Sequence, residues 1–253
     1  MKVTFLGTGT STGVPVIGCK CATCTSSDLR DRRLRSSILW EINGTTLLVD
    51  AGPDLRQQLL TAQCTKIDGI LITHEHYDHV GGIDDVRGLN YSMRQSINIY
   101  AEKRTADTIR NNLSYVFAAH KYPGVPNLIL NVIDENTFNI NGLDITPIRV
   151  IHCKLPILGY RIGACAYITD ASYISPESLN LLKGCKILII NALRQFEHLS
   201  HFTLQQALEV VDFVKPERAY LTHICHDMGL YAEVQPTLPQ NVFLAYDNLS
   251  FEY

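Results

Sequence analysis

The sequence predicts an α/β fold in which helices cover the faces of β-sheets. Short apolar runs of strand type alternate with helix-like segments through both halves of the 253-residue chain. No linker, tandem repeat or low-complexity tract divides it. Hydrophobic residues make up 46% and charged residues 19% of the chain, and a chain of this length can bury a full core. We therefore expect a single domain over residues 1–253.

The first half of the chain contains a clear hairpin signal. Apolar runs over Ser37–Ile42 and Thr45–Val49 flank the dipeptide Asn43-Gly44, which favours a tight turn between paired strands. The segment 118–127 contains two prolines and a glycine and is expected to be a loop. The other elements expected here are strands over Lys2–Leu6, Gly69–Thr73 and Ile97–Tyr100, and helices over Pro53–Ala62 and Glu102–Asn112.

The second half contains more strands than helices, and several candidate ligands directly follow the strands. We therefore expect one compact unit whose site is assembled from loops at strand ends. The strands are expected over Leu128–Val132, Leu143–Val150, Leu158–Ile162, Ala166–Thr169, Lys186–Ile190, Arg218–Leu221, Val242–Ala245 and Leu249–Glu252, and the helices over Pro176–Leu182 and Thr203–Phe213.

Composition and charge exclude several classes of protein. The net charge of −3 gives no general attraction to nucleic acid or to anionic membranes. The N-terminal apolar stretch stops at Gly7, too early for a secretory signal, and no run approaches the ~20 apolar residues of a spanning helix. A cytoplasmic location is expected. In that compartment the eight cysteines do not indicate a disulfide framework, and clustered cysteines are typical of metal binding or redox chemistry.

The segment Thr73–His79, with the sequence Thr-His-Glu-His-Tyr-Asp-His, carries the strongest chemical signal. Three imidazoles and a carboxylate follow a buried strand within six residues, and this donor set suits Zn, Mn or Fe. His74 and His76 alternate along an extended segment and can bind one metal. Asp78 and His79 lie one turn further on and can bind a second. A pair of metals can clamp both ends of an in-line displacement.

The pattern His-x-His-x-Asp-His after a strand resembles the signature of the metallo-β-lactamase superfamily, and the similarity extends over essentially the whole chain. It implies a four-layer αββα sandwich of two mixed β-sheets flanked by helices, with the metals at one edge between the sheets. It also implies that His152 completes the first metal site, that Asp170 bridges both metals and that His223 binds the second. Asp50 is expected to orient the ligand loop without touching metal.

Cys19, Cys21 and Cys24 place three thiols within six residues. A tetrahedral structural zinc needs a fourth ligand, for which Cys225 and His226 are both candidates. The Cys-x-Cys-x-x-Cys cluster resembles that of PhnP-type phosphodiesterases, in which a late histidine closes the site. This resemblance implies that His226 is the fourth ligand.

Further segments resemble the same subfamily. Phe5–Ser11 is similar to the opening strand and loop that it shares with ribonuclease Z. His201 resembles a histidine that binds no metal and lies beside the scissile phosphate, where an imidazole can stabilise negative charge and protonate a leaving oxygen. Arg87 is a candidate for substrate binding: it could meet a phosphate or pair with Asp84 or Asp85.

The resemblance implies a dinuclear phosphodiesterase acting on a small, cyclic phosphodiester. A hydroxide bridging two divalent metals (Zn or Mn) would attack phosphorus, Asp78 would help to move a proton, and His201 would stabilise the developing charge. A separate structural zinc would occupy a Cys-rich insert near residues 18–35. A homodimer would be unsurprising for this superfamily.

Three alternatives remain open. A ribonuclease Z-like tRNA 3′-processing endonuclease usually carries a long arm that this chain lacks, so nucleic acid is not the favoured partner. A lactone or thioester hydrolase of the same superfamily would use the same metals. A non-catalytic, zinc-stabilised binding module would leave the His/Asp residues without a role. His120 and His198 match no motif, and the basic run Arg30–Arg35 is expected to be a solvated face or a phosphate contact.

Overall fold

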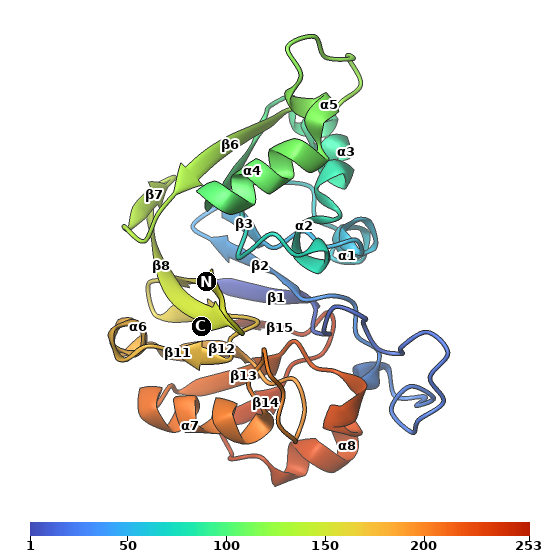
Figure 1. The fold of residues 1–253 in the computed structure, drawn as a ribbon, viewed down its shortest axis with the longest axis vertical. Helices are drawn as coiled ribbons and strands as arrows, with labels where there is room; N and C mark the ends of the chain where they lie inside the picture. Colours follow the sequence, from blue (N-terminus) through green and yellow to red (C-terminus); the bar gives the residue numbers. More distant parts are fainter. The chain divides into compact units, whose positions relative to one another are not determined.

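The structure is a computed structural model that describes all 253 residues. The chain forms two compact units (Figure 1). The first unit comprises Met1–Leu6, Ser37–Asp134 and Asn248–Tyr253, and the second comprises Gly7–Ser36 and Glu135–Asp247. Each unit contains one mixed β-sheet and its own helices. This arrangement confirms the expected α/β class with two mixed sheets flanked by helices.

The first unit is built on a seven-stranded sheet in the order β15-β1-β2-β3-β4-β5-β6. The pairs β1–β15 and β2–β3 are antiparallel, whereas β3, β4, β5 and β6 run parallel to one another. The strands are β1 (Lys2–Gly7), β2 (Ser37–Ile42), β3 (Thr45–Val49), β4 (Gly69–Leu71), β5 (Ile97–Glu102), β6 (Leu128–Ile133) and β15 (Ser250–Glu252).

Helices cover this sheet because most side chains of its parallel strands β3, β4 and β5 are buried. Helix α4 packs on β5 and β6 through the buried face of Thr105, Ala106 and Ile109 (Figure 1). The helices of the first unit are α1 (Leu55–Thr61), α2 (Tyr77–Val80), α3 (Arg87–Met93), α4 (Lys103–Asn112) and α5 (Ser114–Phe117), with a 3-10 turn at Ile83–Val86.

The second unit contains an eight-stranded sheet in the order β11-β8-β9-β10-β12-β13-β14, with β7 paired to β8. Strands β8, β9 and β10 are antiparallel, and β10, β12, β13 and β14 are parallel. The strands are β7 (Phe138–Ile140), β8 (Leu143–His152), β9 (Leu155–Ile162), β10 (Cys165–Ile168), β11 (Tyr173–Ile174), β12 (Ile187–Asn191), β13 (Arg218–Thr222) and β14 (Val242–Leu244).

Helix α7 shows how the sequence places the helices of the second unit. It begins at a capping box formed by Thr203 and Gln206, and its buried face packs on β12. The helices are α6 (Pro176–Leu182), α7 (Leu204–Val214) and α8 (Tyr231–Val234), with 3-10 turns at Leu29–Asp31, His226–Met228 and Gln235–Thr237. None of the helices in the chain has both the length and the apolar character needed to span a bilayer.

The expected strands and helices are present, with ends shifted by a few residues. The hairpin β2–β3 has the expected boundaries, and its turn residues Asn43 and Gly44 have φ values of 50° and 79°. Strands β7 and β11 and the short helices α2, α5 and α8 were not expected. The prediction of a single domain over the whole chain stays a prediction.

Candidate metal centres

The first group of candidate ligands lies at the end of β4 in the first unit. The chain leaves the sheet in extended conformation and enters α2 at Tyr77. His74 Nε2 lies 3.0 Å from His76 Nδ1, and the rings of His74 and His79 are 4.2 Å apart. His79 Nε2 lies 3.2 Å from Asp78 Oδ2. The four side chains of the motif therefore converge, and His74 and His79 are buried.

Asp50 holds this group from the end of β3. Its Oδ1 accepts a hydrogen bond from the Thr73 amide at 2.9 Å, and its Oδ2 accepts one from His79 Nδ1 at 2.7 Å. A proton on Nδ1 leaves the lone pair of the neutral His79 ring on Nε2, the nitrogen beside Asp78. Complete burial raises the pKa of the Asp50 carboxyl, and its contacts with His79 and Thr73 oppose that rise.

Backbone contacts tie the two ends of this arrangement together. The Ala51 amide donates to the His79 carbonyl at 2.7 Å, and the Gly82 amide donates to the Ala51 carbonyl at 2.8 Å. A Cβ at Gly82 would lie 2.0 Å from the carbonyl oxygen of Gly52. The close approach of the two loops therefore requires glycine at position 82.

The second group of candidate ligands belongs to the second unit. His152 ends β8, Asp170 follows β10, and His223 follows β13. His223 Nε2 lies 3.2 Å from Asp170 Oδ1. His152 Nδ1 donates to the carbonyl of Ser200 at 2.8 Å, which leaves the lone pair of the neutral ring on Nε2.

Three of the predicted site residues have left-handed backbone conformations within two residues of the end of a strand. The φ values are 61° at Asp50, 57° at Asp170 and 56° at His223. Residues other than glycine rarely adopt this region, and those that do cluster at functional sites. The left-handed residue turns the chain sharply at each strand end.

The donors in each unit fit divalent metal ions. The first unit offers three imidazoles and a carboxylate, and the second offers two imidazoles and a carboxylate. This mixture of nitrogen and oxygen donors suits Zn or Mn. Each group also contains a histidine whose Nδ1 is hydrogen-bonded to a residue outside the candidate ligands. The acceptor is Asp50 for His79 and the Ser200 carbonyl for His152. Metal-binding histidines usually have such a partner.

His201 lies beside the second group. Its Nε2 is 3.1 Å from Asp170 Oδ1, and its ring stacks on that of His223 with a centroid distance of 4.9 Å. Its Nδ1 lies 3.1 Å from Nδ1 of His198, a residue for which no motif predicts a role. The spacing of three residues within a loop carries no motif, so only the structure reveals this pair.

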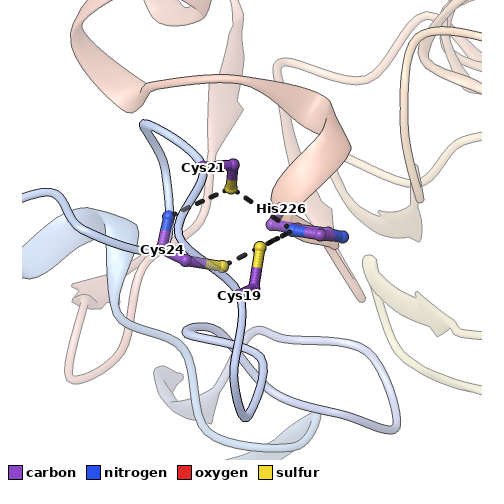
Figure 2. Close-up of side chains that lie close together, drawn as sticks. All are labelled: Cys19, Cys21, Cys24 and His226. Carbon is purple, nitrogen blue, oxygen red and sulfur yellow. Dashed lines mark hydrogen bonds between the residues drawn. The ribbon is translucent and has the colours of Figure 1, made fainter.

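A third group of side chains lies within the second unit (Figure 2). Nδ1 of His226 is 3.3 Å from Cys19 Sγ and 3.4 Å from the sulfurs of Cys21 and Cys24. Tetrahedral zinc with bonds of about 2.0 Å to nitrogen and 2.3 Å to sulfur would place these atoms about 3.5 Å apart. The four residues fit a structural zinc site, and Cys225, the other candidate from the sequence, is not in this group.

Backbone amides polarise the thiols of this group. The Val16 amide donates to Cys24 Sγ at 3.3 Å, and the Cys24 amide donates to Cys21 Sγ at 3.4 Å. The latter contact lowers the pKa of Cys21 to about 6, whereas burial raises the pKa of Cys24 to about 11. Three clustered thiols ionise together only when a cation balances their charge.

The arginines singled out in the sequence have partners within their own units. Arg87 pairs with Asp84 at 2.6 Å, so its role in substrate binding stays a prediction. Arg33 is buried and donates hydrogen bonds to Thr8 Oγ1 and to the Ala245 carbonyl. The expectation that Arg30–Arg35 forms a solvated face is therefore wrong for Arg33.

Comparison with known proteins identifies the family. Residues 45–224 match the family model described as the Beta-lactamase superfamily domain. A solved structure described as a new diphosphatase from the PhnP family is 37% identical, with a TM-score of 0.93 over 100% of this chain and 97% of that one. Zinc-bound PqqB from Methylobacterium extorquens has the same fold at 21% identity, with a TM-score of 0.79 and 100% coverage of both chains.

An octanoyltransferase from Porphyromonas gingivalis is 42% identical over 252 residues, which are 98% of this chain and 51% of that protein. The chain spans about half the length of the curated relatives that it matches first. It belongs to the metallo-β-lactamase superfamily and, within it, to the PhnP type.

Proposed function

We propose that the chain hydrolyses small phosphodiesters with the help of two divalent metal ions. The observation that carries the proposal is the position of His201. Its Nε2 lies beside Asp170 and its ring lies on His223, yet it is not needed to complete the expected ligand set. A proton donor beside metal ligands supports hydrolysis rather than a role in binding alone.

In this proposal, His74, His76 and His152 would hold one ion, and Asp78, His79 and His223 would hold the other. Asp170 would be a further ligand. Two such ions, when bound, supply a strong nucleophile from water at neutral pH and neutralise charge on phosphate oxygens. Zn and Mn both suit these donors.

The protein side chains handle orientation and protons. Asp50 fixes the His79 ring through its 2.7 Å hydrogen bond, and the Ser200 carbonyl fixes the His152 ring. Asp78 accepts or releases a proton during attack by water. With a proton on each ring nitrogen, His201 would donate its Nε2 proton to the leaving oxygen and become neutral with the remaining proton on Nδ1, because Nε2 is directed toward the candidate ligands whereas Nδ1 is hydrogen-bonded away from them.

The relatives support phosphorus as the atom attacked. The PhnP-family relative is described as a diphosphatase, and a diphosphate diester presents the same substituted phosphate group as a phosphodiester. The preferred substrates are therefore small, cyclic phosphodiesters, followed by diphosphate diesters. A second candidate is acyl chemistry, which the octanoyltransferase name of another relative suggests, because activated water also attacks a carbonyl carbon.

A panel of substrates separates these candidates. The protein, purified with Mn or Zn, is assayed on bis-p-nitrophenyl phosphate, 2′,3′-cyclic AMP, a dinucleoside diphosphate, a lactone and an octanoyl thioester. We expect turnover of a phosphorus substrate, together with about three metals per chain. Turnover of the lactone or thioester alone would overturn the proposal, and so would binding without hydrolysis of any substrate.

A variant of His201 tests the observation on which the proposal depends. His201→Gln is expected to lower kcat by roughly 100-fold or more while the protein keeps its metal content. His120→Gln, at an exposed position, is the matched control and should retain full activity.

A further inference from the structure

Two histidines face each other in the loop between β12 and α7. Nδ1 of His198 lies 3.1 Å from Nδ1 of His201, and the ring centroids are 5.0 Å apart. The hydroxyl of Ser200 lies 3.2 Å from the first nitrogen and 3.0 Å from the second. Nothing in the proposed reaction uses His198.

The hydrogen-bond donors decide which ring carries the shared proton. Two Nδ1 atoms at this distance can share only one proton. The backbone amide of Ser200 points at Nδ1 of His198 at 3.3 Å. An amide N–H only donates, so Nδ1 of His198 is the acceptor and the proton lies on Nδ1 of His201.

We propose that His198 is a positioning residue for His201. By accepting the hydrogen bond from Nδ1 of His201, it fixes the rotation of that ring and keeps Nε2 directed toward Asp170, 3.1 Å away. The inference rests on the proposed function, in which the His201 ring, with a proton on each nitrogen, gives its Nε2 proton to the leaving oxygen and keeps the proton on Nδ1. Such a partner for a catalytic imidazole improves the geometry of proton transfer without touching the substrate.

The state of His198 fits the role of an acceptor. Burial, followed by the neighbouring His201 and Arg194, lowers the pKa of His198. A lowered pKa favours the neutral ring, which has the lone pair that accepts a proton from a neighbour.

The loop keeps its conformation independently of His198. The Leu193 amide donates to the Phe202 carbonyl at 2.9 Å, and the Leu204 amide donates to the Arg194 carbonyl at 2.8 Å, which closes the loop at its base. Arg194 also donates to the Glu197 carbonyl at 2.6 Å. Substitutions at His198 should therefore leave the base of the loop unchanged and remove only the contacts of its Nδ1 with Ser200 and with the His201 ring.

The test compares two leaving groups. The metal-loaded wild type, His198→Ala and His198→Asn are assayed on the p-nitrophenyl and phenyl esters of thymidine 5′-monophosphate, with His120→Ala as the control. Phenol leaves poorly and depends on protonation, whereas p-nitrophenol leaves readily. For His198→Ala we expect kcat to fall roughly 10- to 100-fold on the phenyl ester and less on the p-nitrophenyl ester, with KM unchanged. His198→Asn should recover most of this loss, because its amide oxygen can take the place of the Nδ1 acceptor.

Equal losses on both esters, or no rescue by Asn, would overturn the inference and indicate a packing role. An unchanged kcat for His198→Ala on the phenyl ester would also overturn it. If the wild type cleaves no phosphorus substrate, the proposed function fails. The Nδ1 proton then remains a separate readout: its ¹H NMR resonance should be present in the wild type and lost in His198→Ala, and its absence from the wild type would contradict the hydrogen bond.

Discussion

The carboxylate of Asp50 accepts a hydrogen bond of 2.7 Å from Nδ1 of His79, and both side chains are completely buried. The other carboxylate oxygen accepts the Thr73 amide at 2.9 Å. One residue at the end of β3 thus fixes both the start and the end of the metal-binding motif. Its two oxygens are both acceptors, and this is a property that an amide cannot reproduce.

Asp50→Asn should weaken metal binding. An asparagine presents one acceptor and one donor, so its NH₂ group must face either the Thr73 amide or Nδ1 of His79, and one contact is lost. We expect metal affinity to fall by roughly 10- to 100-fold, measured by competition with a chelator. Asp85→Asn, at an exposed position, is the control, and equal affinities for the two variants would refute the orienting role of Asp50.

Removal of one thiol should separate the third metal site from the others. Cys21→Ser is expected to lower bound zinc by about one ion per chain and to reduce stability. The melting temperature should fall by roughly 5–10 °C. In a chain of this size, each ~1 kcal/mol lost from the free energy of unfolding lowers the melting temperature by about 2–4 °C. Metal analysis and thermal unfolding measure both effects. Cys64→Ser, outside the group, should change neither, and an unchanged zinc count in Cys21→Ser would be incompatible with the site.

Arg33 and Arg32 provide a matched pair within the basic run. The buried guanidinium of Arg33 donates to Thr8 Oγ1 and to the Ala245 carbonyl, and burial lowers its pKa to about 10, so that it is still protonated at neutral pH. Arg33→Lys keeps the charge but cannot reach both acceptors, and it should destabilise the protein by about 1–3 kcal/mol. Arg32→Lys, at an exposed position, should change stability by less than about 0.5 kcal/mol. Denaturant unfolding distinguishes them, and equal midpoints would contradict the structural role of Arg33.

Two glycines should respond to alanine in opposite directions. A Cβ at Gly82 would lie 2.0 Å from the Gly52 carbonyl oxygen, whereas a Cβ at Gly88 meets nothing within 4 Å. Gly82→Ala should cost at least about 2–3 kcal/mol, because the loops beside the motif must separate. Gly88→Ala lies in helix α3 and should stabilise by up to about 1 kcal/mol. Thermal unfolding of both variants checks the signs, and destabilisation by Gly88→Ala would show that the helix is packed differently.

Local patterns predicted the elements of the fold well, because apolar runs and turn residues are properties of short segments. Asn43-Gly44 marked the β2–β3 hairpin, and Asn141-Gly142 could have marked β7–β8 by the same rule, since its φ values are 50° and 83°. That second hairpin was missed because Phe138–Ile140 is a very short strand. The extension of β9 to Leu155 was missed because Pro156 interrupts its strand pattern.

The tertiary partners of polar residues could not be predicted in this way. Arg33 lies in a run that reads as a surface, yet its carbonyl partner, Ala245, is 212 residues away in the sequence. The opposed Nδ1 atoms of His198 and His201 depend on the path of one loop rather than on composition. The motif at His74 was visible because its ligands are neighbours in the sequence.

The left-handed residues at the ends of β3, β10 and β13 affect how this protein should be mutated. Alanine at Asp50, Asp170 or His223 would remove a functional group and would also strain the backbone by about 1 kcal/mol. Asparagine tolerates this conformation. An alanine scan would therefore overstate the chemical importance of these three positions, and asparagine substitutions would measure the side chains alone.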